Sequence, residues 1–161
     1  MNAPKDTDLT PLHCIFFIYY TFASHNNGKT QTAEVKQIIN YMKNWETNSV
    51  KNRLIIKETI KWASNIIKSP EEAISTMFSM ADYLNTENSF DVSKKERLLL
   101  DIRNISRIDN VFSDNEKKWH DLLAHHLNVS LRISSCSVKD IENSAEEVKR
   151  TKIGFRSPKK K

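Results

Sequence analysis

Two short segments of the chain share a spacing of oxygen-bearing residues that could bind a cation. In one segment Asp109 precedes Glu116 by seven positions, and in the other Asn27 precedes Glu34 by the same seven positions. Carboxylate and amide oxygens are the ligands that Ca²⁺ and Mg²⁺ prefer. One pair supplies too few ligands for either ion, so a site requires the fold to bring both segments together. Asn27 weakens this prediction, because it offers a neutral oxygen where the other copy has a carboxylate.

The same two segments also have a purely structural interpretation. Gly28 and Asn110 suit a left-handed residue that closes the preceding helix, and Ser113 with Glu116 has the spacing of a capping box for the next helix. An EF-hand is excluded, because its twelve-residue loop, counted from Asp109, has the wrong residues at the glycine and glutamate positions. Helix capping and cation binding therefore both remain open.

The composition predicts an all-α fold. The chain of 161 residues has two glycines and four prolines, fewer turn residues than an all-β fold usually needs. The apolar run 12–23 is too short to span a bilayer, which takes roughly 20 residues, and is typical of a buried helix. We expect one bundle of about seven helices over 11–148, in two pseudo-symmetric halves, between a flexible arm (1–10) and a basic tail (149–161). The predicted helices cover 11–24, 32–46, 50–68, 70–84, 93–108, 113–127 and 138–149.

Local signals place the ends and faces of several of these helices. Ser69-Pro70-Glu71-Glu72 combines a serine cap, a first-turn proline and two acids at the positive end of the helix dipole. Ser93 and Glu96 have the spacing of another capping box. In the helix over 50–68, one stripe predicts the inner face; it consists of Leu54, Ile56, Ile60, Ala63 and Ile67, and Trp62 and Ile66 widen it.

The order of an apolar helix, a polar turn, a hydrophobic residue and Ser-x-x-Glu resembles the TerB-like domain of tellurite-resistance and stress-response proteins. The resemblance covers Leu9–Glu46 and roughly Pro70–Val129. The resemblance implies an all-helical fold of two related halves, with an acidic patch suspected of binding divalent cations. It implies no established catalysis, and it implies a protein that acts near membrane complexes. The family's acidic positions correspond to Asp109, Glu116 and Glu34, whereas its aspartate is replaced by Asn27 and its glycine by Asn110.

The positive charge of the chain is concentrated in its last thirteen residues. These hold seven bases and no acid, so the other 148 residues carry 18 bases against 20 acids. A basic tail can bind the phosphates of nucleic acid or of anionic membranes, or it can be a solvated end without such a role. The seven bases are Lys149, Arg150, Lys152, Arg156, Lys159, Lys160 and Lys161.

The remaining reactive side chains form no recognisable catalytic group. One predicted helix holds Glu116 and Asp121 together with His120, His125 and His126. These histidines are either ordinary surface or boundary residues or part of a transition-metal site. A helical enzyme that uses His120 or His125 with a carboxylate is a further alternative. The two cysteines lack metal-ligand spacing and suggest free thiols in a reducing compartment. We therefore expect a cytoplasmic, non-enzymatic TerB-like domain that binds protein partners and a divalent cation, Ca²⁺ or Mg²⁺. The resemblance also allows a peripheral location at the inner face of the membrane. The alternative is a module that binds nucleic acid or anionic membranes through the tail.

Overall fold

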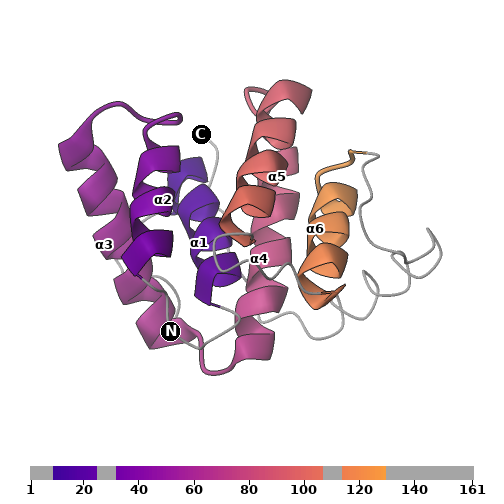
Figure 1. The fold of residues 1–161 in the computed structure, drawn as a ribbon, viewed down its shortest axis with the longest axis horizontal. Helices are drawn as coiled ribbons and strands as arrows, with labels where there is room; N and C mark the ends of the chain where they lie inside the picture. Colours follow the sequence, from indigo (N-terminus) through magenta and orange to yellow (C-terminus); the bar gives the residue numbers. More distant parts are fainter. Residues whose placement is uncertain (1–8, 25–31, 107–113, 130–161) are drawn as a thin grey trace.

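The computed structural model describes residues 9–24, 32–106 and 114–129, which form six helices and contain no strand. The prediction of an all-α chain is confirmed for these residues (Figure 1). The seventh helix predicted over 138–149 lies outside them. The helices are α1 (Pro11–Ser24), α2 (Thr32–Met42), α3 (Ser49–Ile66), α4 (Pro70–Asn85), α5 (Val92–Ser106) and α6 (Asp114–His126).

Helix α1 is the centre of the bundle. It contacts α2, α3, α4 and α5, while α6 packs against α4 and α5 (Figure 1). Every residue from His13 to Tyr19 is buried, as expected for a helix that is apolar on all sides. The prediction that the apolar run forms a buried helix is therefore confirmed.

Two helix starts show which capping signals the fold uses. Ser69 caps α4 as predicted, since its Oγ accepts a hydrogen bond from the N–H of Glu72 at 3.1 Å. The capping box predicted at Ser93 is wrong. Asp91 caps α5 instead, because its Oδ1 accepts from the N–H of Lys94 at 3.1 Å, and Ser93 lies inside the first turn. Aspartate caps as well as serine does, and here it stands one residue before the start of the helix.

The face of α3 that contacts the bundle agrees only in part with the predicted one. Trp62 is buried as predicted, and Ile56, Ala63, Ile66 and Ile67 pack partly buried against the core. The buried residues of α3 are Asn52, Ile55, Thr59 and Trp62, whereas Leu54 is 53% exposed and Ile60 is 38% exposed. The polar members of the buried face keep hydrogen bonds: the Asn52 amide donates to the carbonyl of Glu46, and the Thr59 hydroxyl donates to the carbonyl of Ile55. The indole of Trp62 packs edge-on against Phe17. The aromatic contact of Trp62 and the hydrogen bonds of Asn52 and Thr59 thus turn α3 so that Leu54 and Ile60 face outward.

Two helix ends differ in their geometry. Helix α2 ends at Met42, four residues earlier than predicted, and the chain continues in tight turns up to Trp45. Helix α6 ends in a Schellman motif, in which the N–H of Val129 donates to the carbonyl of Ala124. Asn128 takes the left-handed residue of that motif, with φ of 60°.

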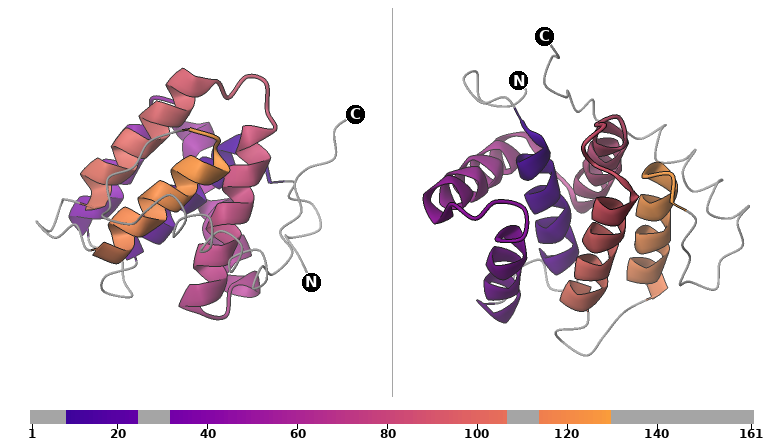
Figure 2. Two further views of the ribbon diagram at one scale, coloured as in Figure 1. Left: turned by 90° about the vertical axis from the view of Figure 1, so that its right-hand side faces the viewer. Right: turned by 90° about the horizontal axis from the view of Figure 1, so that it is seen from above.

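Four helix termini lie at one end of the bundle. Helices α1 and α5 pack side by side and both end there, and α2 and α6 both begin there (Figures 1 and 2). The helices that flank residues 25–31 and 107–113 therefore share this end of the molecule.

Candidate functional site

The structure describes only part of the predicted cation site. Asn27 and Asp109 lie outside the described residues, and Glu34 belongs to the first turn of α2 but its side chain is not described. Glu116 lies in the first turn of α6 and is fully buried. Within the described ranges, no group of three or more His, Cys, Asp or Glu side chains is placed to hold a metal ion. The oxygen donors suit a hard cation, but a complete site would need ligands from Asn27, Asp109 or Glu34 beside Glu116.

His120, like Glu116, is a fully buried titratable side chain of α6. Its Nδ1 lies 3.0 Å from Oδ1 of the buried Asp121. Burial lowers the pKa of His120, the Asp121 carboxylate opposes that shift, and the positive charge of Arg103 on α5 adds to it. The interpretation of His120 as a surface or boundary residue is therefore wrong.

A sequence signal for the burial of His120 exists. Glu116, His120, Leu123 and Leu127 follow one another at intervals of four, three and four residues, which places them on one helix face. All four are buried. The apolar members of this stripe identify the inner face, and the two polar members share it.

The other histidines of α6 differ from His120. His125 is exposed, as the ordinary interpretation predicted. His126 departs from that interpretation, because it is buried, with its Nδ1 2.6 Å from Oδ1 of Asp82 and its ring stacked on Phe78. These contacts tie α6 to α4.

A buried hydrogen-bond chain links α1 to α5 and to the turn after α2. The Tyr19 hydroxyl donates to Oδ2 of Asp101 at 2.7 Å and accepts from the Trp45 indole N–H at 2.9 Å. Burial raises the pKa of Asp101, while the Tyr19 hydrogen bond opposes the shift. Sequence reasoning missed this chain because its members come from three elements and show no common spacing.

Cys14 lies in the centre of α1. It is a free, fully buried thiol, and burial raises its pKa. A thiol held in its neutral form is a poor nucleophile and a poor metal ligand. Cys136 lies outside the described residues.

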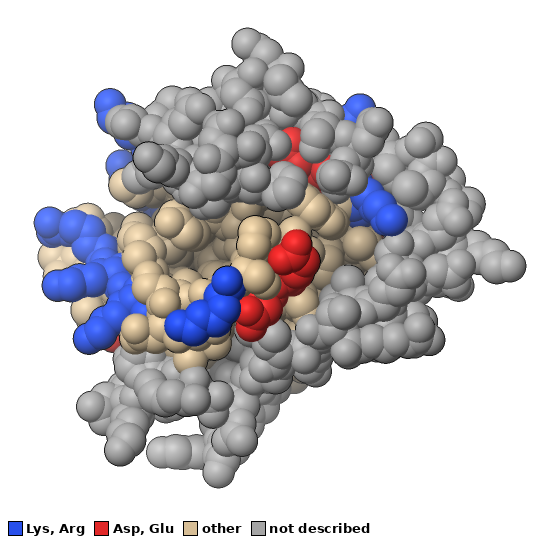
Figure 3. All heavy atoms as spheres, turned by 90° about the horizontal axis from the view of Figure 1, so that it is seen from below, with Lys and Arg blue, Asp and Glu red and all other residues tan. Residues whose placement is uncertain are grey.

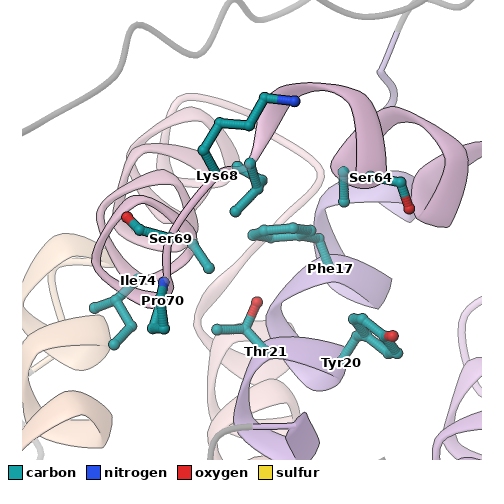
Figure 4. Close-up of a pocket in the computed structure, with 11 residues that line it drawn as sticks. Phe17, Tyr20, Thr21, Ser64, Lys68, Ser69, Pro70 and Ile74 are labelled. Carbon is teal, nitrogen blue, oxygen red and sulfur yellow. The ribbon is translucent and has the colours of Figure 1, made fainter. Parts of the chain in front are cut away.

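A cavity of about 470 Å³ opens between α1, α3 and α4 (Figure 4). Most of its wall is apolar, with Phe17 from α1, Ala63 from α3 and Ile74 from α4. Lys68, in the link between α3 and α4, also lines it. No motif in the sequence pointed to this cavity, because its wall is made from three helices.

The outward face of α3 carries a described cationic surface. Arg53, Lys57 and Lys61 are exposed, and Lys and Arg side chains gather along this edge of the molecule (Figure 3). The seven tail bases predicted to bind anions lie outside the described residues, namely Lys149, Arg150, Lys152, Arg156, Lys159, Lys160 and Lys161. In the described part of the chain, no helix is both long enough and apolar enough to cross a membrane.

Comparison with protein-family models, with curated proteins and with solved structures gave no match to this chain. The resemblance to TerB-like domains consequently stays a prediction from the residues that carry it.

Proposed function

We propose that this chain is a non-enzymatic, cytoplasmic TerB-like domain, linked to tellurite or related chemical stress. In this proposal it acts by binding protein partners, and a Ca²⁺ or Mg²⁺ ion tunes that binding. The observation that supports the proposal is the position of four helix termini, the ends of α1 and α5 and the starts of α2 and α6, at one end of the bundle (Figures 1 and 2).

This arrangement is the one that a shared cation site requires. Asn27 belongs to the connection between α1 and α2, and Glu34 to the first turn of α2. In the same way, Asp109 belongs to the connection between α5 and α6, and Glu116 to the first turn of α6. Because α1 packs against α5, the two connections start from neighbouring helices. Two related halves, as the resemblance implies, would then contribute oxygen ligands to one ion, which takes at least six.

Cation binding can be tested by replacing proposed ligands other than the buried Glu116. Glu116 is fully buried, so its replacement would test folding as much as binding. Asp109→Asn and Glu34→Gln each remove one carboxylate charge and keep the size of the side chain. Glu96→Gln is a matched control, since Glu96 is exposed near the start of α5, at the opposite end of that helix.

We expect calorimetric titration of the full chain with Ca²⁺ or Mg²⁺ to show saturable heat and a higher melting temperature. Both effects should persist in Glu96→Gln and disappear in Asp109→Asn and Glu34→Gln. Absence of heat and of any change in melting temperature with Ca²⁺, Mg²⁺, Mn²⁺ and Zn²⁺ would remove the cation from the proposal. Unchanged binding in both variants would place the ion elsewhere.

A second candidate function is binding to anionic membranes, and the outward face of α3 supports it. Arg53, Lys57 and Lys61 are spaced four apart, so they lie on one face and repel one another. None of them forms an ion pair with another described residue. An anionic surface would offset that repulsion, and the basic tail would add to the attraction.

Exposed apolar side chains on the same face favour lipid over nucleic acid. Val50 is 66% exposed and Leu54 is 53% exposed, and both stand among the cations of α3. A helix surface that combines cations with apolar residues suits the boundary between headgroups and acyl chains. Nucleic acid would use the cations alone.

The test measures co-sedimentation of the full chain with phosphatidylcholine vesicles that contain or lack phosphatidylglycerol. We expect retention only on the anionic vesicles. Combined Arg53→Gln, Lys57→Gln and Lys61→Gln should reduce it, and so should truncation after Val148. The control replaces the exposed bases Lys36, Lys43 and Lys94 by glutamine and loses the same charge. Equal loss in the control would show that only net charge matters, and retention on DNA but not on vesicles would favour nucleic acid.

A further inference from the structure

We infer that the cavity between α1, α3 and α4 is a binding site for a small amphipathic monoanion, an apolar body that carries one carboxylate. Its volume of about 470 Å³ lies within the range of small-molecule sites, which is roughly 300–1,000 Å³. Glu116, the proposed cation ligand whose side chain the structure describes, does not line this cavity.

The walls of the cavity suit an apolar body. Phe17, Ile67 and Ile74 supply large apolar surfaces, and Ala63 and Ala73 contribute methyl groups where longer side chains would occupy the space. Protein interiors normally fill such gaps with their own side chains. An apolar ligand would recover the missing contacts and would displace water that has few polar partners there.

The rim carries one positive charge. Lys68 is exposed, forms no ion pair with the rest of the described chain, and is the charged member among the described lining residues. In the view of Figure 4, the Phe17 ring lies between Lys68 and Thr21. The Lys68 ammonium is directed away from the Phe17 ring in this view, so a ligand whose apolar part contacts Phe17 would extend its anionic group to the outer rim to meet it.

The other polar groups of the rim favour one negative charge over two. The Ser64 hydroxyl donates to the carbonyl of Ile60, and Ser69 Oγ caps α4 by accepting from Glu72. Glu71 and Glu72 follow shortly after Lys68 but do not line the cavity. Because Lys68 is the one charged residue among the described lining residues, it balances a monocarboxylate, whereas a dianion would keep a second charge without a partner there.

Decanoate is a suitable probe for the full chain, with decanol as its neutral counterpart. We expect calorimetry to show saturable binding of decanoate at one site, and amide chemical shifts to change around Ala63 and Ala73. Lys68→Gln should weaken decanoate binding about two- to fivefold, the effect of a charge pair near the surface, without changing decanol binding. Lys61→Gln, an exposed lysine of α3 that does not line the cavity, should change neither.

Filling the cavity tests the location independently of charge. Ala73→Leu and Ala63→Leu place larger side chains in the space from α4 and from α3, and leucine keeps high helix propensity. Each variant should abolish decanoate binding while its far-ultraviolet circular dichroism spectrum stays helical. If one substitution overpacks the core and unfolds the protein, the result of the other, folded variant tests the location. Decanoate binding that survives in a folded variant, or decanol and decanoate binding equally well in wild type, would overturn the inference.

Discussion

The hairpin of α1 and α2 and the hairpin of α5 and α6 approach the same end of the bundle but bury different side chains. Helix α1, covered by four other helices, buries mainly aromatic and aliphatic groups. Helix α6 packs mainly against α4 and α5, with Trp119 edge-on to Phe22 of α1, and yet buries Glu116, His120 and Asp121. The comparison indicates that α1 is stabilised mainly by apolar burial, whereas the second hairpin holds much of the buried charge.

The largest expected effect comes from truncating the core of α1. Ile18 is fully buried, so Ile18→Ala should lower the free energy of unfolding by about 2–5 kcal/mol, through lost transfer energy and the cavity that remains. Leu54→Ala, on the exposed face of α3, should change it by less than about 0.5 kcal/mol. Urea unfolding measures both, and equal losses would contradict the described faces of α1 and α3.

A smaller loss is expected from the polar link between the two hairpins. Tyr19→Phe removes the hydroxyl that donates to Asp101 and accepts from Trp45. Leaving a buried carboxylate without this donor should cost about 1–3 kcal/mol. A loss well below 1 kcal/mol in urea unfolding would show that this chain of hydrogen bonds contributes little.

The second hairpin should also respond to pH. Burial keeps the folded-state pKa of His120 below its usual 6.5, so the unfolded state binds the proton more tightly. Stability is then complete above pH 6.5 and declines as the pH falls through that value toward the folded-state pKa. His13 of the first hairpin is shifted in the same direction, also chiefly by burial.

The measurement is the urea midpoint between pH 8 and pH 5 for wild type and for His120→Gln. We expect a decline toward acid pH in wild type and a shallower decline in the variant, with His13 responsible for the remainder. A variant that follows the wild-type curve would show that His120 does not contribute to the pH dependence.

The smallest effect should come from Asp101→Asn. Burial raises the folded-state pKa of Asp101 above its usual 3.8, so the ionised carboxylate costs stability at neutral pH, and that cost disappears as the pH falls through the raised pKa. The amide removes the charge and still offers an oxygen to the Tyr19 hydroxyl. We expect a gain of about 1 kcal/mol or less at pH 7; a clear loss in urea unfolding at that pH would contradict the sign.

Sequence patterns predicted the elements of the fold better than their faces. The apolar run of α1 and the Ser69-Pro70 start of α4 are local signals, and the structure confirms both. The inner face of α3 depends on the aromatic contact between Trp62 and Phe17, two residues that are distant in the sequence. No local pattern reports such a contact.

For the candidate sites as well, local spacing could be predicted from the sequence and tertiary contacts could not. The spacing of Glu34 and Glu116 within their segments is visible in the sequence, but the common end of the four helix termini follows from packing between α1 and α5. The cavity beside Lys68 needs three helices at once. Predictions that rest on tertiary contacts therefore required the structure.

The most direct test of a cation site shared by the two hairpins is paramagnetic relaxation by Mn²⁺ in the isotopically labelled full chain, with Mg²⁺ as the diamagnetic reference. If both hairpins supply ligands, amide signals near Ser24 and Glu34 and those near Ser106 and Glu116 should broaden together at the same Mn²⁺ concentration. Broadening confined to one hairpin, or no selective broadening at either, would contradict the shared site.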